Sequence, residues 1–165
     1  MKRKILFVCL GNICRSPLAE ALFSEMVATA GLSGFLEADS CGTSGQHQGE
    51  EPDVRTLRNA KSNGIEIRHR SRQLEPADFM RFHLILTMDR SNYRNTLSLA
   101  KKNGHHEADI RLMRSFDPAG SDQAEVPDPW YGGEEGFEEV FRILQRSCQG
   151  LLETLRKEMA PQISA

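Results

Sequence analysis

The fold is decided near the amino terminus by residues 4–17, which read KILFVCLGNICRSP. Residues 4–9 form a continuous apolar run, which is typical of a strand buried on both faces of a parallel sheet. Ser16 is a favourable N-cap and Pro17 suits the first helical position, so we expect a helix to begin there. Gly31 ends an apolar pattern of helical spacing formed by Leu18, Ala21, Leu22 and Met26. Strand, short loop and helix together open a βαβ unit.

The rest of the chain alternates between strand-like and helix-like segments. Further strands are predicted at 35–41, 82–88 and 110–113, and helices at 53–63, 91–102 and 137–155. The alternation predicts a three-layer α/β/α fold with a four-stranded parallel sheet, of the flavodoxin-like kind. We expect one domain over residues 1–160 and a flexible tail over 161–165.

Composition narrows the class of protein. The 165 residues carry 21 basic and 23 acidic side chains, a formal net charge of -2, which gives no bulk attraction to nucleic acid or anionic membranes. No apolar run approaches the ~20 residues of a membrane span, and the run after the basic start is too short for a secretion signal. We therefore expect a cytoplasmic protein, a monomer, that binds neither nucleic acid nor membrane.

Four cysteines, Cys9, Cys14, Cys41 and Cys148, are compatible with a reducing compartment. No Cys-x-x-Cys pair and no close grouping of cysteine and histidine exists, which argues against a structural zinc site. We expect no metal and no cofactor. In a reducing compartment cysteines indicate catalysis or metal binding before a disulfide framework, so without a metal site we expect a catalytic cysteine. Cys41 and Cys148 look structural.

The loop from Cys9 to Arg15 has the features of an anion-binding site. It lies at the carboxyl end of a strand and the amino end of a helix, where free backbone N–H groups and the helix dipole favour negative charge. Gly11 allows a sharp turn, and Asn12 tolerates a left-handed backbone. We expect the amides of the loop, Leu10, Gly11, Asn12, Ile13 and Cys14, to point inward as a nest. Arg15 can hold two oxygens of a phosphate at once.

The same surroundings favour the thiolate form of Cys9, and the hydroxyl of Ser16 could donate a hydrogen bond to it. Two plainer interpretations exist for the separate parts. A lone cysteine at a strand end is usually core filler, and a glycine at a strand–helix junction is often only a turn. The combination of strand, glycine, asparagine, arginine and Ser-Pro favours a functional anion loop.

The stretch CLGNICRSP resembles the signature of the low-molecular-weight protein tyrosine phosphatases, and the similarity covers nearly the whole chain. Further matching blocks are Asp39 to Gly45, Gly64-Ile65, His69, Arg72-Gln73, Met88-Asp89 and Asp128 to Tyr131. The resemblance implies the low-molecular-weight phosphatase fold, a four-stranded parallel sheet flanked by helices, with no metal. It implies that Cys9 forms a phosphocysteine intermediate, while Arg15 and the loop amides bind phosphate.

The resemblance also assigns the general acid to Asp128, in the stretch VPDPWYGG. Two prolines stiffen this loop and could aim the carboxylate, although Asp-Pro on its own is a common turn dipeptide. Trp130 and Tyr131 could stack on an aromatic ring at the rim, which favours an aryl phosphate and hence phosphotyrosine. His47 is expected near the same rim, where it would tune the choice of substrate.

A supporting network is implied by the same family. Ser40 and His69 match positions that hydrogen-bond with Asn12 and Ser16, although His69 could also be a solvated residue in a basic run. Asp89 is expected to cap the next helix and support the site. Cys14 could form a reversible disulfide with Cys9, as relatives do, or be a small buried side chain.

Three rival functions remain open. Arsenate reductases of this fold need further cysteines in a mobile segment, and none lies between Cys41 and Cys148. Relatives that act on phosphoarginine carry threonine where this chain has Ile13. A non-catalytic phosphate-sensing module would be expected to lack Cys9 or Asp128. The partners we expect are phosphotyrosine-containing proteins, as in a bacterial tyrosine kinase system.

Overall fold

The apolar run near the amino terminus forms an interior strand of the sheet. The structure is a computed structural model that describes residues 1–165. Strand β1 (Arg3–Cys9) pairs in parallel with β2 (Leu36–Gly42) on one side and β3 (Leu84–Thr87) on the other, and β4 (Asp109–Leu112) follows, giving the order β2-β1-β3-β4. All pairings are parallel, so the prediction of a four-stranded parallel sheet is confirmed.

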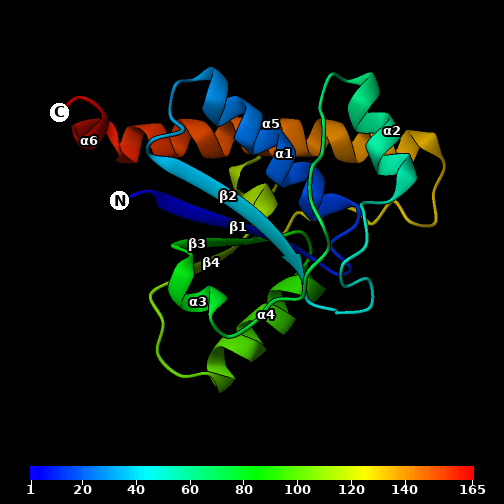
Figure 1. Ribbon diagram of the computed structural model, residues 1–165, viewed down its shortest axis with the longest axis horizontal. Helices are drawn as coiled ribbons and strands as arrows, with labels where there is room; N and C mark the ends of the chain where they lie inside the picture. The colour runs from blue at the N-terminus through cyan, green and yellow to red at the C-terminus, as the bar shows by residue number, and fades with distance from the viewer.

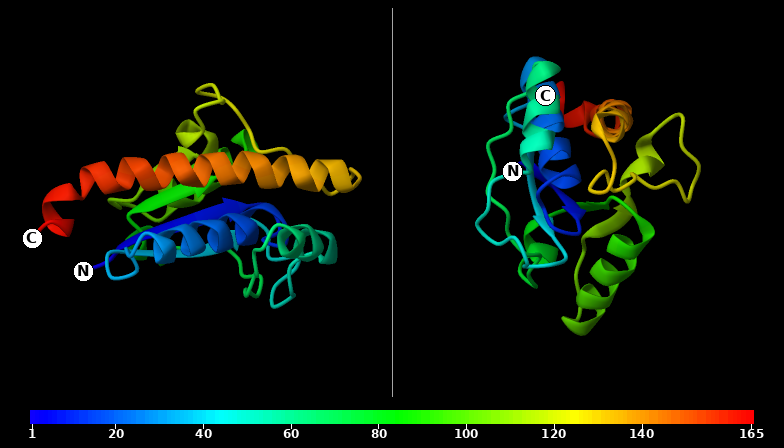
Figure 2. Two further views of the ribbon diagram at one scale, coloured as in Figure 1. Left: turned by 90° about the horizontal axis from the view of Figure 1, so that it is seen from above. Right: turned by 90° about the vertical axis from the view of Figure 1, so that its right-hand side faces the viewer.

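Helices cover both faces of this sheet, as the three-layer prediction required (Figure 1). They are α1 (Arg15–Thr29), α2 (Val54–Ser62), α3 (Asp78–Arg81), α4 (Arg90–Lys102), the 3-10 helix η1 (Met113–Phe116), α5 (Glu134–Glu158) and α6 (Ala160–Ile163). The long helix α5 runs beside α1 on one face, while α3 and α4 lie on the other (Figures 1 and 2).

The alternation of β1 divides its side chains between two cores. Ile5 and Phe7 point with Cys9 toward the larger core under α1 and α5, whereas Leu6 and Val8 belong to the smaller core under α3 and α4. Strand side chains point to opposite faces in turn, and this periodicity puts Cys9 on the α1 side at the last position of the strand. The nucleophile candidate is thus the last of five consecutive buried residues of β1.

Helix α1 begins two residues earlier than the capping signal predicted. The prediction of Ser16 as N-cap is wrong: the helix starts at Arg15, and Ser16 directs its hydroxyl at Cys9 instead of a backbone N–H. Pro17 is still tolerated, because N–H groups of the first helical turn have no partner inside the helix. Gly31 follows the end of α1 with φ +71°, the left-handed conformation predicted by the stop signal.

The carboxyl-terminal part of the chain follows its apolar stripe. Helix α5 contains the predicted segment 137–155 and extends it at both ends, with acidic residues in the first turn and basic residues in the last. The segment 161–165, expected to be a flexible tail, includes most of α6, and Ile163 packs against the larger core. None of the helices combines the length and the apolar character needed to cross a membrane.

Candidate active site

The loop after β1 is anchored from below by the segment that follows β2. The N–H groups of Thr43 and Ser44 donate to the carbonyls of Cys9 and Leu10, both at 2.9 Å. A Cβ on Gly42 would lie 2.6 Å from the Leu10 carbonyl, so only glycine fits at the end of β2. Backbone contacts with the segment after β2 therefore help to set the shape of the loop.

Within the loop, Asn12 has a left-handed backbone, with φ +57°, as predicted. This conformation turns its N–H group toward the Cys9 sulfur, at 3.3 Å. The sulfur also lies 2.9 Å from the hydroxyl oxygen of Ser16. Asn12 Nδ2 donates to that oxygen at 2.7 Å, so the Ser16 proton points either at the sulfur or at the more distant Cys41 carbonyl, at 3.3 Å. Both contacts stabilise a thiolate.

The Asn12 side chain is the centre of a buried network. Its Nδ2 also donates to Ser40 Oγ at 3.0 Å, and its Oδ1 accepts from the backbone N–H of Arg72 at 3.0 Å. Since a backbone N–H can only donate, this bond fixes the orientation of the amide. His69 Nε2, 2.7 Å from the same Oδ1, must then carry a proton.

The far side of His69 faces acidic groups. Its Nδ1 lies 3.1 Å from Glu20 Oε1 and 3.9 Å from Asp39. These three residues form the one grouping whose atoms are close enough to hold a metal ion. Their atoms are already engaged, because Ser40 donates to Glu20 and Arg72 binds Asp39, so the grouping fits a structural role better than a metal site. The structure thus brings Ser40 and His69 together with the loop from Cys9 to Arg15.

Arg15 is buried beside the loop, with only 4% of its side chain exposed. Its Nη1 donates to Asp89 Oδ2 at 2.8 Å and to the Val126 carbonyl at 2.9 Å. Burial alone would lower the pKa of Arg15, but the neighbouring Cys9 and Asp89 raise it above its ordinary value. Asp89 also caps α4, as predicted, by accepting from the Asn92 N–H at 2.7 Å. The guanidinium is thereby fixed as a permanent cation beside the sulfur.

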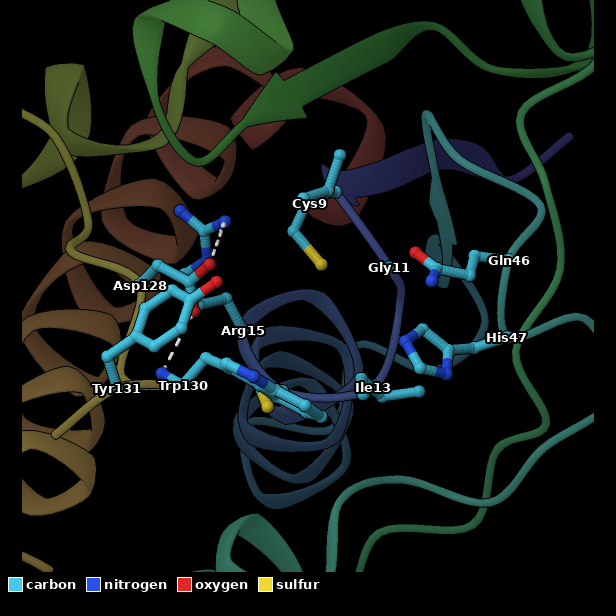
Figure 3. Close-up of a pocket in the computed structure, with 11 residues that line it drawn as sticks. Cys9, Gly11, Ile13, Arg15, Gln46, His47, Asp128, Trp130 and Tyr131 are labelled. Atoms are coloured by element: carbon cyan, nitrogen blue, oxygen red, sulfur yellow. Dashed lines mark hydrogen bonds and ion pairs between the residues drawn. The ribbon is translucent and has the colours of Figure 1, made fainter. Parts of the chain in front are cut away.

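The pocket above the loop has two walls (Figure 3). Asp128, Trp130 and Tyr131 line one side, and Gln46 and His47 line the other, with the rings of His47 and Trp130 6.1 Å apart. Asp128 Oδ2 lies 3.9 Å from Arg15 Nη2. The cavity measures about 270 Å³, below the range of about 300–1,000 Å³ usual for drug-sized ligands, and suits one modified side chain.

The two wall aromatics differ in their exposure. Tyr131 is 93% exposed and Trp130 40%, so both lie at the edge of the pocket and not in the core. His47 is hydrogen-bonded to Glu50, which holds its ring toward the pocket. Of the residues expected at the rim, the structure places all three around one opening.

Cys14 lies within the loop, contributes to the pocket lining and packs in a small apolar cluster with Ile13 and Phe137. Burial raises the pKa of Cys14 to about 12, so it is a neutral thiol at physiological pH. All four cysteines are free, and Cys41 and Cys148 are fully buried. No bond joins Cys9 to Cys14 in this reduced form.

Arg55 is the residue at the site that the sequence did not reveal. It lies in the first turn of α2 yet donates to the Trp130 carbonyl, 75 positions further along the chain, at 3.0 Å. The short motif Asp-x-Arg at a helix start signals only a cap. No local pattern could have indicated a contact that arises when α2 and the Asp128 loop meet in the fold.

Comparisons with known proteins agree with this geometry. The family model described as low molecular weight phosphotyrosine protein phosphatase matches residues 4–161. A low molecular weight protein-tyrosine-phosphatase of Streptomyces coelicolor is 42% identical over 161 residues, covering 96% of this chain and 97% of the relative.

Two solved structures extend the comparison. A protein tyrosine phosphatase from Entamoeba histolytica superposes with a TM-score of 0.88 at 37% identity, covering 95% of this chain and 99% of that one. A Drosophila arginine phosphatase superposes with a TM-score of 0.87 at 30% identity, covering 94% and 98%.

Proposed function

The chain belongs to the low molecular weight phosphotyrosine protein phosphatase family, and we propose that it hydrolyses phosphotyrosine in proteins through a phosphocysteine on Cys9. One observation carries the proposal. The Cys9 sulfur, the Arg15 guanidinium and the Asp128 carboxylate converge on one pocket sized for a single side chain (Figure 3). Nucleophile, anion clamp and acid are the three parts that a covalent phosphatase needs.

The first step transfers the phosphoryl group to sulfur. The Cys9 thiolate attacks phosphorus, the S–P bond forms, and the bond to the phenolic oxygen breaks. Asp128, entering as the carboxylic acid, gives its proton to that oxygen, so tyrosine leaves neutral. Arg15 and the loop amides hold the equatorial oxygens, over which negative charge is spread during transfer.

The second step returns the enzyme to its starting form. Asp128, now a carboxylate, accepts a proton from a water molecule that attacks phosphorus, and the S–P bond breaks. Inorganic phosphate and the Cys9 thiolate are the products, and Asp128 is protonated again. The Ser16 hydroxyl and the Asn12 N–H stabilise the sulfur as a leaving thiolate, as they do before attack.

A phosphotyrosine substrate suits the rim better than phosphoarginine. Trp130, Tyr131 and His47 present aromatic rings at the opening, and a phenyl ring can stack on one of them. The similarity to an arginine phosphatase keeps phosphoarginine as the second candidate. Ile13 presents an apolar side chain to the pocket, which disfavours a charged guanidinium.

Two finer parts of the proposal concern the cell. The four free thiols agree with a reducing cytoplasm, where phosphoproteins made by a bacterial tyrosine kinase system would be the substrates. Under peroxide, Cys14 is close enough in the chain to reduce a Cys9 sulfenic acid, releasing water and forming a disulfide. A thiol reductant would restore both thiols.

The test compares phosphotyrosine, phosphoarginine and phosphoserine peptides by phosphate release in the presence of a chelator. We expect phosphotyrosine to be cleaved fastest, Cys9→Ser to abolish turnover and Asp128→Ala to lower kcat by about 10²–10³-fold. Asp122→Ala, which removes an exposed carboxylate from the same region, is the matched control and should keep full activity. Turnover by Cys9→Ser, or a preference for phosphoarginine, would refute the proposal.

A further inference from the structure

The loop that carries Asp128 is held on its amino-terminal side at Val126, which is hydrogen-bonded to Met88 and Arg15, and has few attachments beyond that point. Within residues 127–132, two hydrogen bonds are internal: Trp130 N–H to Asp128 Oδ1 at 3.0 Å and Gly132 N–H to the Pro129 carbonyl at 2.9 Å. Asp128 itself lies 3.9 Å from Arg15, too far for a hydrogen bond. The one hydrogen bond to another element is the 3.0 Å bond from Arg55 Nη1 to the Trp130 carbonyl.

The Arg55 guanidinium is itself held from several sides. Its Nε and Nη2 donate to the two oxygens of Asp53 at 3.0 and 2.9 Å, in a bidentate pair. Its central carbon lies 5.2 Å from the centre of a Trp130 ring and 4.8 Å from that of Phe137. These aromatic contacts add a cation–π attraction to the hydrogen bonds. Arg55 thus contacts both the backbone and the side chain of Trp130.

Asp53 connects Arg55 to the phosphate-binding loop. Its backbone N–H donates to the Ile13 carbonyl at 2.8 Å, inside that loop, and its Oδ1 caps α2 through the N–H of Arg55 at 2.8 Å. The hydrogen bond from Arg55 also holds the pKa of the Asp53 carboxyl below its ordinary value, so the pair stays ionised. A continuous path therefore runs from Ile13 through Asp53 and Arg55 to Trp130, two residues from Asp128.

We propose that Arg55 is a positioning residue, which sets the height of the Asp128 loop over the phosphate-binding loop so that the acid reaches the leaving oxygen. The inference rests on the proposed role of Asp128 as general acid. Three nitrogens in one rigid plane donate to three oxygens, two on Asp53 and one on Trp130, and the flat face of the guanidinium packs against the aromatic rings. A lysine has neither the fork nor the plane, so it cannot reproduce the arrangement.

A displaced acid has a distinctive kinetic effect. Loss of protonation slows the departure of a strongly basic phenolate, whereas p-nitrophenolate is a weak base that leaves without help. Phosphate binding, which depends on Arg15 and the loop amides, is not affected. A defect confined to basic leaving groups would therefore separate a positioning role from general damage to the fold.

The experiment measures kcat/KM for phenyl phosphate and p-nitrophenyl phosphate, with inhibition by inorganic phosphate as a check on the binding loop. For Arg55→Ala we expect about a tenfold loss on phenyl phosphate and less than about a twofold loss on p-nitrophenyl phosphate, with unchanged inhibition. Arg55→Lys keeps a cation opposite Asp53 and should show a smaller loss with the same selectivity. Arg58→Ala, an exposed arginine one turn along α2, is the matched control and should match the parent protein.

A double-mutant cycle completes the test. In an Asp128→Ala background, Arg55→Ala should cost less than about twofold, because no acid remains to be positioned. Equal losses on the two substrates, or an undiminished loss in that background, would overturn the inference. If Asp128→Ala lowered kcat/KM equally for both substrates, the proposed role of Asp128 as general acid would fail. If Asp128→Ala lowered it mainly for phenyl phosphate while Arg55→Ala had no effect, only the proposed role of Arg55 would be refuted.

Discussion

Replacing Asn12 by alanine should destabilise the protein and deform the phosphate-binding loop. The side chain is fully buried and makes four contacts, to Ser16, Ser40, His69 and the Arg72 N–H. Alanine leaves the Arg72 N–H and a Ser16 lone pair without a partner, at about 1–2 kcal/mol each. The left-handed backbone, without a side-chain hydrogen bond to support it, adds about 1 kcal/mol. The free energy of unfolding should fall by about 3–5 kcal/mol in total.

Urea unfolding at neutral pH, followed by fluorescence of the single tryptophan, measures this loss. Asn12→Gly separates its two causes, because glycine loses the same hydrogen bonds but adopts positive φ freely. It should be about 0.5–1 kcal/mol more stable than Asn12→Ala, the gain being reduced by the greater freedom of glycine in the unfolded chain. A loss below about 1 kcal/mol for alanine, or a glycine variant less stable than the alanine variant, would contradict the argument.

Two further predictions concern stability away from the pocket. A Cβ on Gly150 would lie 2.0 Å from the Phe116 carbonyl, so Gly150→Ala should cost about 3 kcal/mol in a thermal unfolding experiment; Gly136→Ala, in the same helix with open space around it, should be neutral or stabilising. Burial raises the pKa of Cys14 to about 12 and that of Cys148 well above its ordinary value. The unfolded chain therefore ionises these thiols first, and stability, fully present below pH 9, should fall as the pH rises toward 11, by up to about 1.4 kcal/mol per pH unit for each thiol. Denaturant unfolding from pH 8 to 11 checks this, and Cys148→Ala should show a shallower fall; an equal slope in that variant would exclude the buried thiol as the cause.

The elements with local signals were predictable from the sequence. The continuous apolar run before Cys9 indicates a strand buried on both faces, and the apolar stripe of α5 has the spacing of a helix. Both signals come from residues that are close together in the chain. Helices α3 and η1 were missed since four residues are too few to show a period. The start of α1 was misplaced because Ser16 was judged by its capping propensity, whereas the fold uses its hydroxyl for Cys9.

The residues of the site also differ in whether the local sequence could predict them. The loop from Cys9 to Arg15 is contiguous, so its chemistry could be inferred from spacing and from the helix that follows. Asp128 has no local signal stronger than a turn, and the resemblance to a family assigned it. Arg55 depends on the meeting of two segments far apart in the chain, which propensities and periodicities do not describe.

The interior position of β1 has a consequence for the order of events during synthesis. Cys9 emerges from the ribosome before β2 and β3, so its strand finds both neighbours only after β3 has been made, and the proposed acid follows some forty residues later still. Helix α5, which packs along α1 and closes the larger core, follows that acid in the chain. A nascent chain therefore carries the Cys9 sulfur before it has an acid, and the complete site forms only after α5 has been synthesised.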